Sequence, residues 1–142
     1  MRIENRTRKT LVGTRVDLAS TWWGRLKGYI GRQEPIPGEG ILLWPCNAVH
    51  TFGMSFDLDI LFLDDRGRVL EMIRSFAPWK KTSRVPGARY VLEGPPGMIE
   101  ESQTEVGDLL TWWDPAPRTV SDRILNRKRT EPQPLTAARG KE

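Results

Sequence analysis

Cysteine and histidine are nearly absent from this sequence of 142 residues, which contains one of each. A single cysteine cannot form a disulfide within one chain, so no oxidised scaffold replaces a hydrophobic core. A closed structural zinc site built only from histidine and cysteine needs four ligands, and the chain offers two. The composition therefore excludes a disulfide-rich domain and a zinc finger, and it favours one domain of ordinary size with an apolar core.

Long apolar runs are also missing from the chain. No segment approaches the ~18–20 consecutive apolar residues that span a bilayer. The first residues, MRIENRTRKTLVG, are basic but lack the ~7–15-residue apolar stretch of a secretory signal. We therefore expect a cytoplasmic protein without a membrane span.

The excess of positive charge is confined to the two ends of the chain. Lysine and arginine number 22 against 18 aspartate and glutamate, a net charge of +4. Residues 1–15 carry five basic and one acidic side chain and residues 114–142 carry seven and four, which leaves ten basic and thirteen acidic in 16–113. No stacked-aromatic or groove-entering module accompanies this charge, so nucleic-acid binding is expected, if at all, only through the basic tail.

The pattern of apolar and turn-forming residues predicts a β-dominated α+β domain. Its strongest signal is a β-hairpin, in which apolar runs at 58–63 and 69–73 flank the turn Asp64–Gly67. A short helix is predicted at 20–31. Gly24 and Gly28 lower its intrinsic stability, and a glycine in a helix often allows close approach to another element. The other predicted elements are strands at 8–16, 41–44, 88–93 and 109–113 and a helical turn within 98–106.

Three regions follow from this reading. Residues 1–7 are expected to form a basic N-terminal arm, and residues 8–113 a single globular domain. Residues 114–142 are rich in proline and basic side chains, so we expect a flexible, largely disordered tail.

The segment that follows Trp44 carries a recognisable pattern. It contains His50-Thr51, then Met54, then an apolar strand with Asp59 that leads into the hairpin turn. Together with the stretch 25–32, this pattern resembles the domain of unknown function 192 family, uncharacterised prokaryotic proteins of the UPF0127 type. Ser55 and Asp57 depart from it, because a basic residue and a proline are usual at those positions.

The resemblance extends over about 8–113 and carries expectations for the fold. It implies a compact, barrel-like antiparallel or mixed sheet with one short N-terminal helix. It implies no reaction and no cofactor, because none is established for the family.

Asp59 is the first candidate site residue. Strand alternation places Leu58, Ile60 and Phe62 on one face and Asp59 with Leu61 and Leu63 on the other, so the strand is apolar on both faces and belongs to the core. A buried carboxylate needs a partner. Asp59 either accepts hydrogen bonds from backbone N–H groups, from Thr51 or from His50 and holds the 46–57 segment, which we favour, or it orients His50 for chemistry.

Cys46 and His50 offer a second candidate chemistry. A cysteine beside a histidine can form a nucleophilic thiolate, with Asp59 or Asn47 as the third member. The spacing of four residues is not specific, because a buried cysteine is usually a small apolar side chain. These three, Cys46, His50 and Asp59, are weak catalytic candidates.

A metal bound by His50, Asp57 and Asp59 is a third alternative, because histidine and carboxylates together bind Zn²⁺, Mn²⁺ or Fe²⁺. Asp57 lies outside the family pattern, so we assign neither a metal nor another cofactor.

Six tryptophans are many for this length. Most are expected to pack in the core and at its rim. Trp79, followed by Lys80-Lys81 in a loop, is the best candidate for exposure, in an aromatic surface that contacts a peptide, a sugar or a partner protein.

We therefore predict a small binding or accessory module rather than an enzyme, whose partner is an unidentified small ligand or protein. Its polar pocket is expected around the His50-Thr51 and Asp59 signature, from the following residues: His50, Thr51, Met54, Asp59 and Glu93. The alternative is a small hydrolase or transferase that uses Cys46 and His50, or a metal bound by histidine and aspartate.

Overall fold

The computed structural model describes residues 1–113, which form two β-sheets and two short helices. The smaller sheet has the strand order β2-β1-β8 and the larger one β3-β4-β7-β5-β6. The strands are β1 (Arg2–Asn5), β2 (Thr10–Gly13), β3 (Arg15–Ala19), β4 (Glu39–Leu43), β5 (Leu58–Leu63), β6 (Val69–Phe76), β7 (Tyr90–Gly94) and β8 (Leu110–Trp113), and the helices are α1 (Trp22–Lys27) and α2 (Met98–Glu101).

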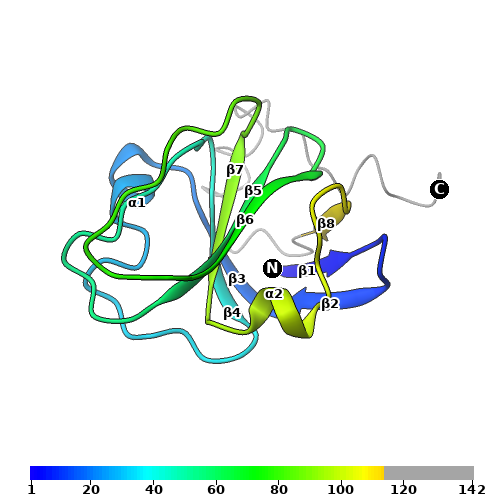
Figure 1. Ribbon diagram of the computed structural model, residues 1–142, viewed down its shortest axis with the longest axis horizontal. Coiled ribbons are helices and arrows are strands. Elements are labelled where there is room, and N and C mark those ends of the chain that lie inside the picture. Colours follow the sequence, from blue (N-terminus) through cyan, green and yellow to red (C-terminus); the bar gives the residue numbers. More distant parts are fainter. Residues whose placement is uncertain (114–142) are drawn as a thin grey trace, which may run out of the picture.

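The β-dominated α+β class and the mixed sheet are confirmed, because β3 pairs with β4 in parallel and the other pairs are antiparallel. The barrel-like expectation is wrong. Neither sheet closes: β3 and β6 are the edges of the larger sheet, and β2 and β8 those of the smaller one. The two sheets instead lie against each other, with α2 beside the smaller one (Figure 1).

The helix is not N-terminal either, since α1 follows three strands and forms the crossover between the parallel strands β3 and β4. Residues 1–7 also differ from the predicted arm. Arg2–Asn5 form β1, the central strand of the smaller sheet, and Ile3 and Asn5 are fully buried. In place of the one strand predicted at 8–16 the chain makes β2 and the start of β3. The predicted tail, 114–142, lies outside the described residues.

The hairpin is confirmed as β5 and β6, joined by a turn that Asp64 and Gly67 shape. The Asp64 carboxylate accepts hydrogen bonds of 2.9 Å from the backbone N–H groups of Arg66 and Arg68. Gly67 has a φ of 90°, a conformation that glycine adopts without steric cost. The predictions at 41–44, 88–93, 98–106 and 109–113 correspond to β4, β7, α2 and β8.

The central strands of the larger sheet, β4, β5 and β7, are buried on both faces, as predicted for strand 58–63. One face packs toward the smaller sheet and the other toward α1 and the loops after β4 and β6, on the opposite side (Figure 1). The first face contributes Leu42, Leu61, Leu63 and Leu92, and the second Ile41, Leu43, Leu58, Ile60, Phe62 and Val91. None of the described helices is long and apolar enough to cross a bilayer.

Asp59 joins three elements on the face toward the smaller sheet. It is 1% exposed, and its two carboxylate oxygens accept from the backbone N–H of Ser75 in β6 (2.9 Å) and of Ile99 in α2 (3.0 Å). Hydrogen bonds to a charged acceptor are stronger than neutral ones. The Asp59 carboxylate therefore fixes the position of α2 relative to the hairpin.

Replacement of Asp59 by alanine leaves two backbone N–H groups without their acceptor. We expect Asp59→Ala to lower the free energy of unfolding by about 2–5 kcal/mol, measured by urea denaturation. The matched control is Asp65→Ala in the exposed hairpin turn, which is expected to change stability by less than about 1 kcal/mol. Equal effects of the two substitutions would contradict the structural role of Asp59.

Candidate functional site

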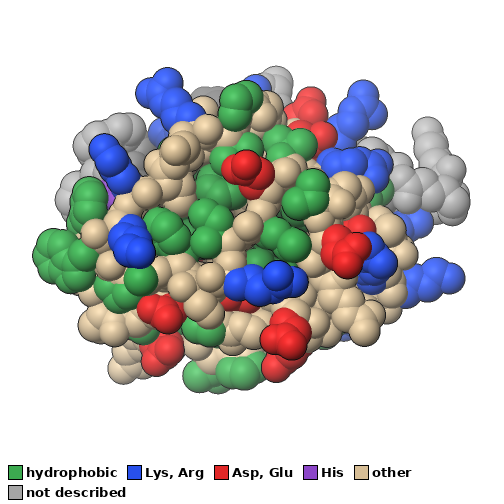
Figure 2. All heavy atoms as spheres, viewed as in Figure 1, with side chains coloured by type: hydrophobic (Ala, Val, Ile, Leu, Met, Phe, Trp, Pro, Cys, Tyr) green, Lys and Arg blue, Asp and Glu red, His purple; other side chains and the backbone are tan. Residues whose placement is uncertain are grey.

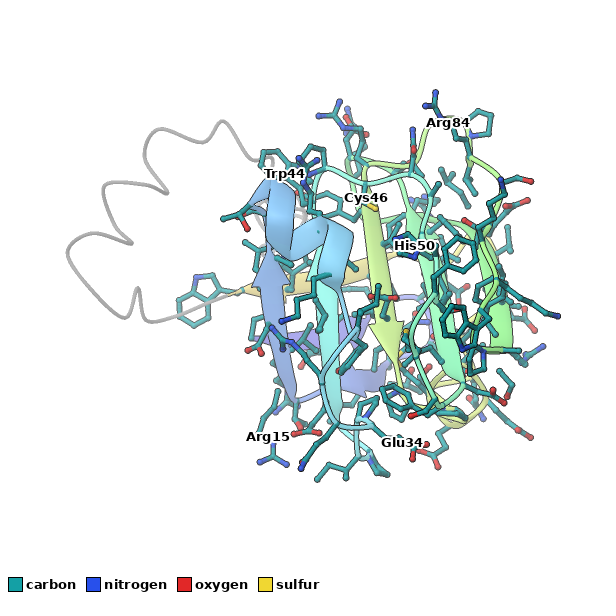
Figure 3. The ribbon with its side chains drawn as sticks, turned by 90° about the vertical axis from the view of Figure 1, so that its left-hand side faces the viewer. Arg15, Glu34, Trp44, Cys46, His50 and Arg84 are labelled. Atoms are coloured by element: carbon teal, nitrogen blue, oxygen red, sulfur yellow. The ribbon has the colours of Figure 1, made fainter. Side chains whose placement is uncertain are left out.

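The segment 46–57 crosses the larger sheet on the side of α1. It begins after a cis peptide bond between Trp44 and Pro45, and the Cys46 N–H donates to Arg89 O over 3.0 Å. Val49 and Met54 are buried in the core of that face. Cys46 and His50 therefore stand on the same side of the sheet, along one stretch of chain (Figure 3).

Cys46 is placed as a packing residue. Its thiol donates to Ala48 O over 3.2 Å, and burial raises the pKa of the thiol, only partly opposed by its hydrogen bond to Ala48. A thiol whose pKa is raised is a poor nucleophile at neutral pH, because the thiolate is the reactive form. The geometry does not support the thiolate alternative.

His50 lies at the rim of the site, and its ring nitrogen Nδ1 accepts from the backbone N–H of Phe52 over 3.3 Å. The acceptor role leaves Nε2 to carry the ring proton when the imidazole is neutral. The backbone of His50 forms an isolated antiparallel bridge with Lys81, which ties the segment to the loop after β6.

The structure does not bring Asp59 and His50 together. Asp59 lies on the face with Leu61, toward α2, whereas the segment that carries His50 covers the face of Ile60. Adjacent residues of a strand point to opposite faces, so the sheet itself separates the two side chains. Asp59 thus accepts hydrogen bonds from backbone N–H groups, as we favoured. These N–H groups belong to Ser75 and Ile99, so Asp59 does not hold the 46–57 segment.

Thr51 and Met54, two further predicted pocket residues, are buried within the structure. The Thr51 hydroxyl donates to Ala77 O (2.7 Å) and accepts from the Lys80 N–H (3.1 Å). Met54 is 4% exposed in the core on the α1 side. These two residues hold the 46–57 segment to its surroundings.

Glu93 and His50 are the two predicted residues that do meet at one cavity. It has a volume of about 70 Å³ and lies between α1, the 46–57 segment and the larger sheet, lined by Arg25, Lys27, Gly28, Leu43, Ala48, Val49, His50 and Glu93. Since a water molecule occupies about 30 Å³ in the liquid, the cavity takes only a few atoms. It has room for about one functional group of a small molecule.

The Glu93 carboxyl group is the unusual feature of this cavity. Glu93 is 2% exposed, and its Oε1 atom has no hydrogen-bond partner among the described residues. Burial raises the pKa of Glu93 to about 8, although the positive charge of Arg32 opposes the rise. At neutral pH the group is mainly a neutral acid, which both donates and accepts hydrogen bonds.

Gly28 closes the cavity over Glu93 and was not among the predicted site residues. It follows α1 with a φ of 45°, and a Cβ atom there would lie only 2.4 Å from Glu93 Oε1. The absence of a side chain thus admits the carboxyl group beneath the helix end. Gly24 and Gly28 were the available signal, since they weaken the helix for close approach to another element.

Arg25 and Lys27 of α1 were also not predicted as site residues. The sequence of a short helix with both polar and apolar residues does not show which of them lie near a strand that is distant in sequence. Arg25 Nη1 donates to Pro45 O over 2.7 Å, which fixes the helix to the start of the 46–57 segment. Two cationic side chains are therefore among the residues that line the cavity with the Glu93 acid.

The metal alternative receives no geometric support. Across residues 1–113, no three histidine, cysteine, aspartate or glutamate side chains converge as metal ligands. His50 and Asp59 lie on opposite sides of the sheet, so the proposed set of His50, Asp57 and Asp59 does not assemble.

Two facing sheets, a parallel β3–α1–β4 crossover and a small polar cavity under the helix define the class of this domain. The family model DUF192, described as "Uncharacterized ACR, COG1430", matches residues 3–112. The chain belongs to this family, as its His50-Thr51 signature indicated.

Curated relatives agree with this assignment. A UPF0127 protein of Thermococcus sibiricus is 30% identical over 116 residues, which cover 76% of this chain and 72% of that relative. A UPF0127 protein of Thermococcus gammatolerans is 37% identical over 65 residues, 46% of this chain. That match and one to a Thermococcus kodakarensis protein span 42% and 41% of the relatives' own length.

Two solved structures share the fold. One is a protein of unknown function from Novosphingobium aromaticivorans, with a TM-score of 0.68 and 21% identity over 78% of this chain and 82% of that one. The other is described as a putative transcription regulator of Sinorhizobium meliloti, with a TM-score of 0.62 and 20% identity over 77% of this chain and 88% of that one. At this identity the likeness concerns the fold alone.

The state of Cys46 has a direct chemical test. Because burial raises the pKa of its thiol, we expect iodoacetamide to label the native protein near neutral pH more slowly than it labels the urea-unfolded chain. The alkylated fraction is followed by intact mass spectrometry. Labelling faster than in the unfolded chain would reinstate the thiolate alternative.

The Glu93 acid makes stability depend on pH. Its pKa is about 8 in the folded protein and near its ordinary value of 4.5 in the unfolded chain, so the folded state holds the proton more tightly. The resulting stabilisation is fully present below about pH 4.5 and is lost as pH rises toward about 8. We expect the wild type to lose on the order of a few kcal/mol across this range, relative to Glu93→Gln.

The measurement is the free energy of unfolding in urea at a series of pH values. Glu71→Gln is the matched control, because Glu71 is an exposed glutamate of the same sheet, on its edge strand β6. The control should follow the wild type at every pH. Parallel curves for wild type and Glu93→Gln would show that Glu93 titrates normally.

Proposed function

We propose that the protein is a small-molecule binding module whose cavity under α1 takes a hydroxyl or amide group of a small anionic ligand. The observation that carries this proposal is the buried Glu93 carboxyl group, whose Oε1 has no partner among the described residues and lines the cavity. A buried polar group without a partner costs free energy. A ligand that supplies the missing hydrogen bond recovers that cost on binding.

The charges around the cavity favour one kind of ligand. Arg25 and Lys27 are among its lining residues and disfavour a cationic group there. A neutral donor, such as a hydroxyl or an amide, satisfies Glu93, while an anionic group of the same ligand lies near the two cations. Small hydroxy acids combine these two groups on adjacent carbon atoms.

Catalysis receives less support than binding. The Cys46 thiol donates to Ala48 and its pKa is raised, and Asp59 is on the far face of the sheet. The cavity contains Glu93 and His50, but no serine, threonine or cysteine is among its lining residues. Recognition is therefore the function to test first.

Glycolate is the probe for this proposal, titrated into the ¹⁵N-labelled full chain and followed by amide chemical shifts. We expect the shifts to be largest at Gly28, His50 and Glu93, because these residues surround the cavity. Acetate lacks the hydroxyl group and ethylene glycol lacks the charge, so each should bind at least about 5-fold more weakly, as for the loss of one hydrogen bond of ~1 kcal/mol.

The variant Glu93→Met removes the carboxyl group with little change in side-chain length. It should abolish the glycolate response and leave the protein at least as stable, because a buried unpaired acid is replaced by an apolar group. Glu71→Met, on the exposed side of β6, is the control that should bind as the wild type does. A glycolate response that survives in Glu93→Met would overturn the proposal.

A further inference from the structure

A ladder of three aromatic rings stands on the surface beside the cavity. The rings of His50 and Phe52 have centroids 5.0 Å apart and a tilt of 31°, and those of Phe52 and Trp79 are 6.4 Å apart with a tilt of 38°. Phe52 is 44% exposed and Trp79 68%. The ladder, defined here as His50, Phe52 and Trp79, thus ends in an indole ring that lies open to solvent.

The backbone holds Trp79 in place at a conformational cost. Trp79 has a φ of 61°, which is uncommon for a bulky residue, and its N–H donates to Thr51 O over 2.9 Å. The Thr51 hydroxyl contacts Ala77 and Lys80 on either side of it. Strain of this kind persists only where surrounding contacts enforce it, and it is concentrated at functional sites.

Positive charge accompanies the ladder. The loop 77–87 carries Lys80, Lys81 and Arg84, all exposed, and has no acidic residue, whereas the segment 16–113 as a whole has an acidic excess. Hydrophobic side chains gather at the end of the molecule that carries α1, with lysine and arginine side chains beside them (Figure 2). Lys80 and Lys81 directly follow Trp79 in the chain, and Arg84 lies further along the same loop.

We propose that this surface binds single-stranded nucleic acid, with bases stacked on Trp79 and Phe52 and phosphates against Lys80, Lys81 and Arg84. Stacked aromatic rings flanked by cations are what such binding requires, and base stacking is tolerant of sequence. The sequence alone indicated no stacked aromatic module, because His50, Phe52 and Trp79 come from two separate loops. The inference does not depend on the cavity or on its ligand.

The alternatives fit the surface less well. A surface that inserts into a membrane exposes aliphatic as well as aromatic side chains. Here the large aliphatic residues of the two loops, Val49, Met54 and Val85, are all buried. An acidic peptide would complement the positive charge, but its acidic side chains have no planar rings that stack on Phe52 and Trp79.

The test uses the full chain and fluorescein-labelled dT12 and rU12, with binding followed by fluorescence anisotropy. Trp79→Ala should weaken binding about 5- to 100-fold, the loss of one base stack. Trp79→Phe should recover most of this loss, and a thermal unfolding curve confirms that each variant is folded. Trp113→Ala is the matched control, since Trp113 is 50% exposed on the other sheet, and it should bind as the wild type does.

Salt dependence tests the phosphate contacts. The slope of log affinity against log salt is expected near −2 for three cations, at about −0.7 per phosphate on a single strand. Lys80→Gln/Lys81→Gln should reduce its magnitude by ~1.4. A control with Arg15→Gln/Arg66→Gln, two exposed arginines at the start of β3 and in the hairpin turn, should leave the slope unchanged.

Two results would overturn the proposal. One is oligonucleotide binding that is insensitive to Trp79→Ala but lost in Arg127→Gln/Lys128→Gln/Arg129→Gln, which would assign it to the basic tail. The other is no oligonucleotide binding, with or without binding of an octaglutamate peptide or of vesicles with phosphatidylserine. Glu93→Met should bind dT12 as the wild type does, which separates this test from that of the cavity.

Discussion

The burial of the central strands of the larger sheet on both faces is the constraint on which the rest of this structure depends. Strands β4, β5 and β7 are covered by the smaller sheet on one side and by α1 with its loops on the other. A polar side chain on these strands has no route to solvent, so its partner must come from the layer that it faces. Asp59 and Glu93 are the two carboxyl groups in this position, and each faces a different layer.

The two layers treat these carboxyl groups differently. Helix α2 and the bulged strand β6 present N–H groups to Asp59, and the carboxylate becomes part of the framework. The layer of α1 presents Gly28 and a small cavity to Glu93, so the acid stays neutral near physiological pH. A core that needed only stability would place an apolar residue there. The contrast between two buried acids of one sheet separates the structural role of Asp59 from the binding role that we propose for Glu93.

The sequence predicted local structure well and long-range juxtaposition poorly. The hairpin, the strand that is apolar on both faces and the loop at 46–57 each follow from a few adjacent residues. The predicted pairing of Asp59 with His50 was wrong. Strand alternation along 58–63 already placed Asp59 on one face of the sheet, but the sequence did not show which face the 46–57 segment covers. Of the pocket, His50 and Glu93 were predicted, whereas Arg25, Lys27 and Gly28 depend on how the β3–β4 crossover packs.

Strand β1 lies between β2 and β8, where Arg2 pairs with Trp113 at the far end of the described chain. In a growing polypeptide β1 therefore precedes its second neighbour, β8, by all the other strands of the two sheets. Until β8 has formed, one face of the larger sheet, with Leu61 and Leu92, has an incomplete cover. Contacts of such long sequence separation form late, so the cover of this apolar face is completed only near the end of folding.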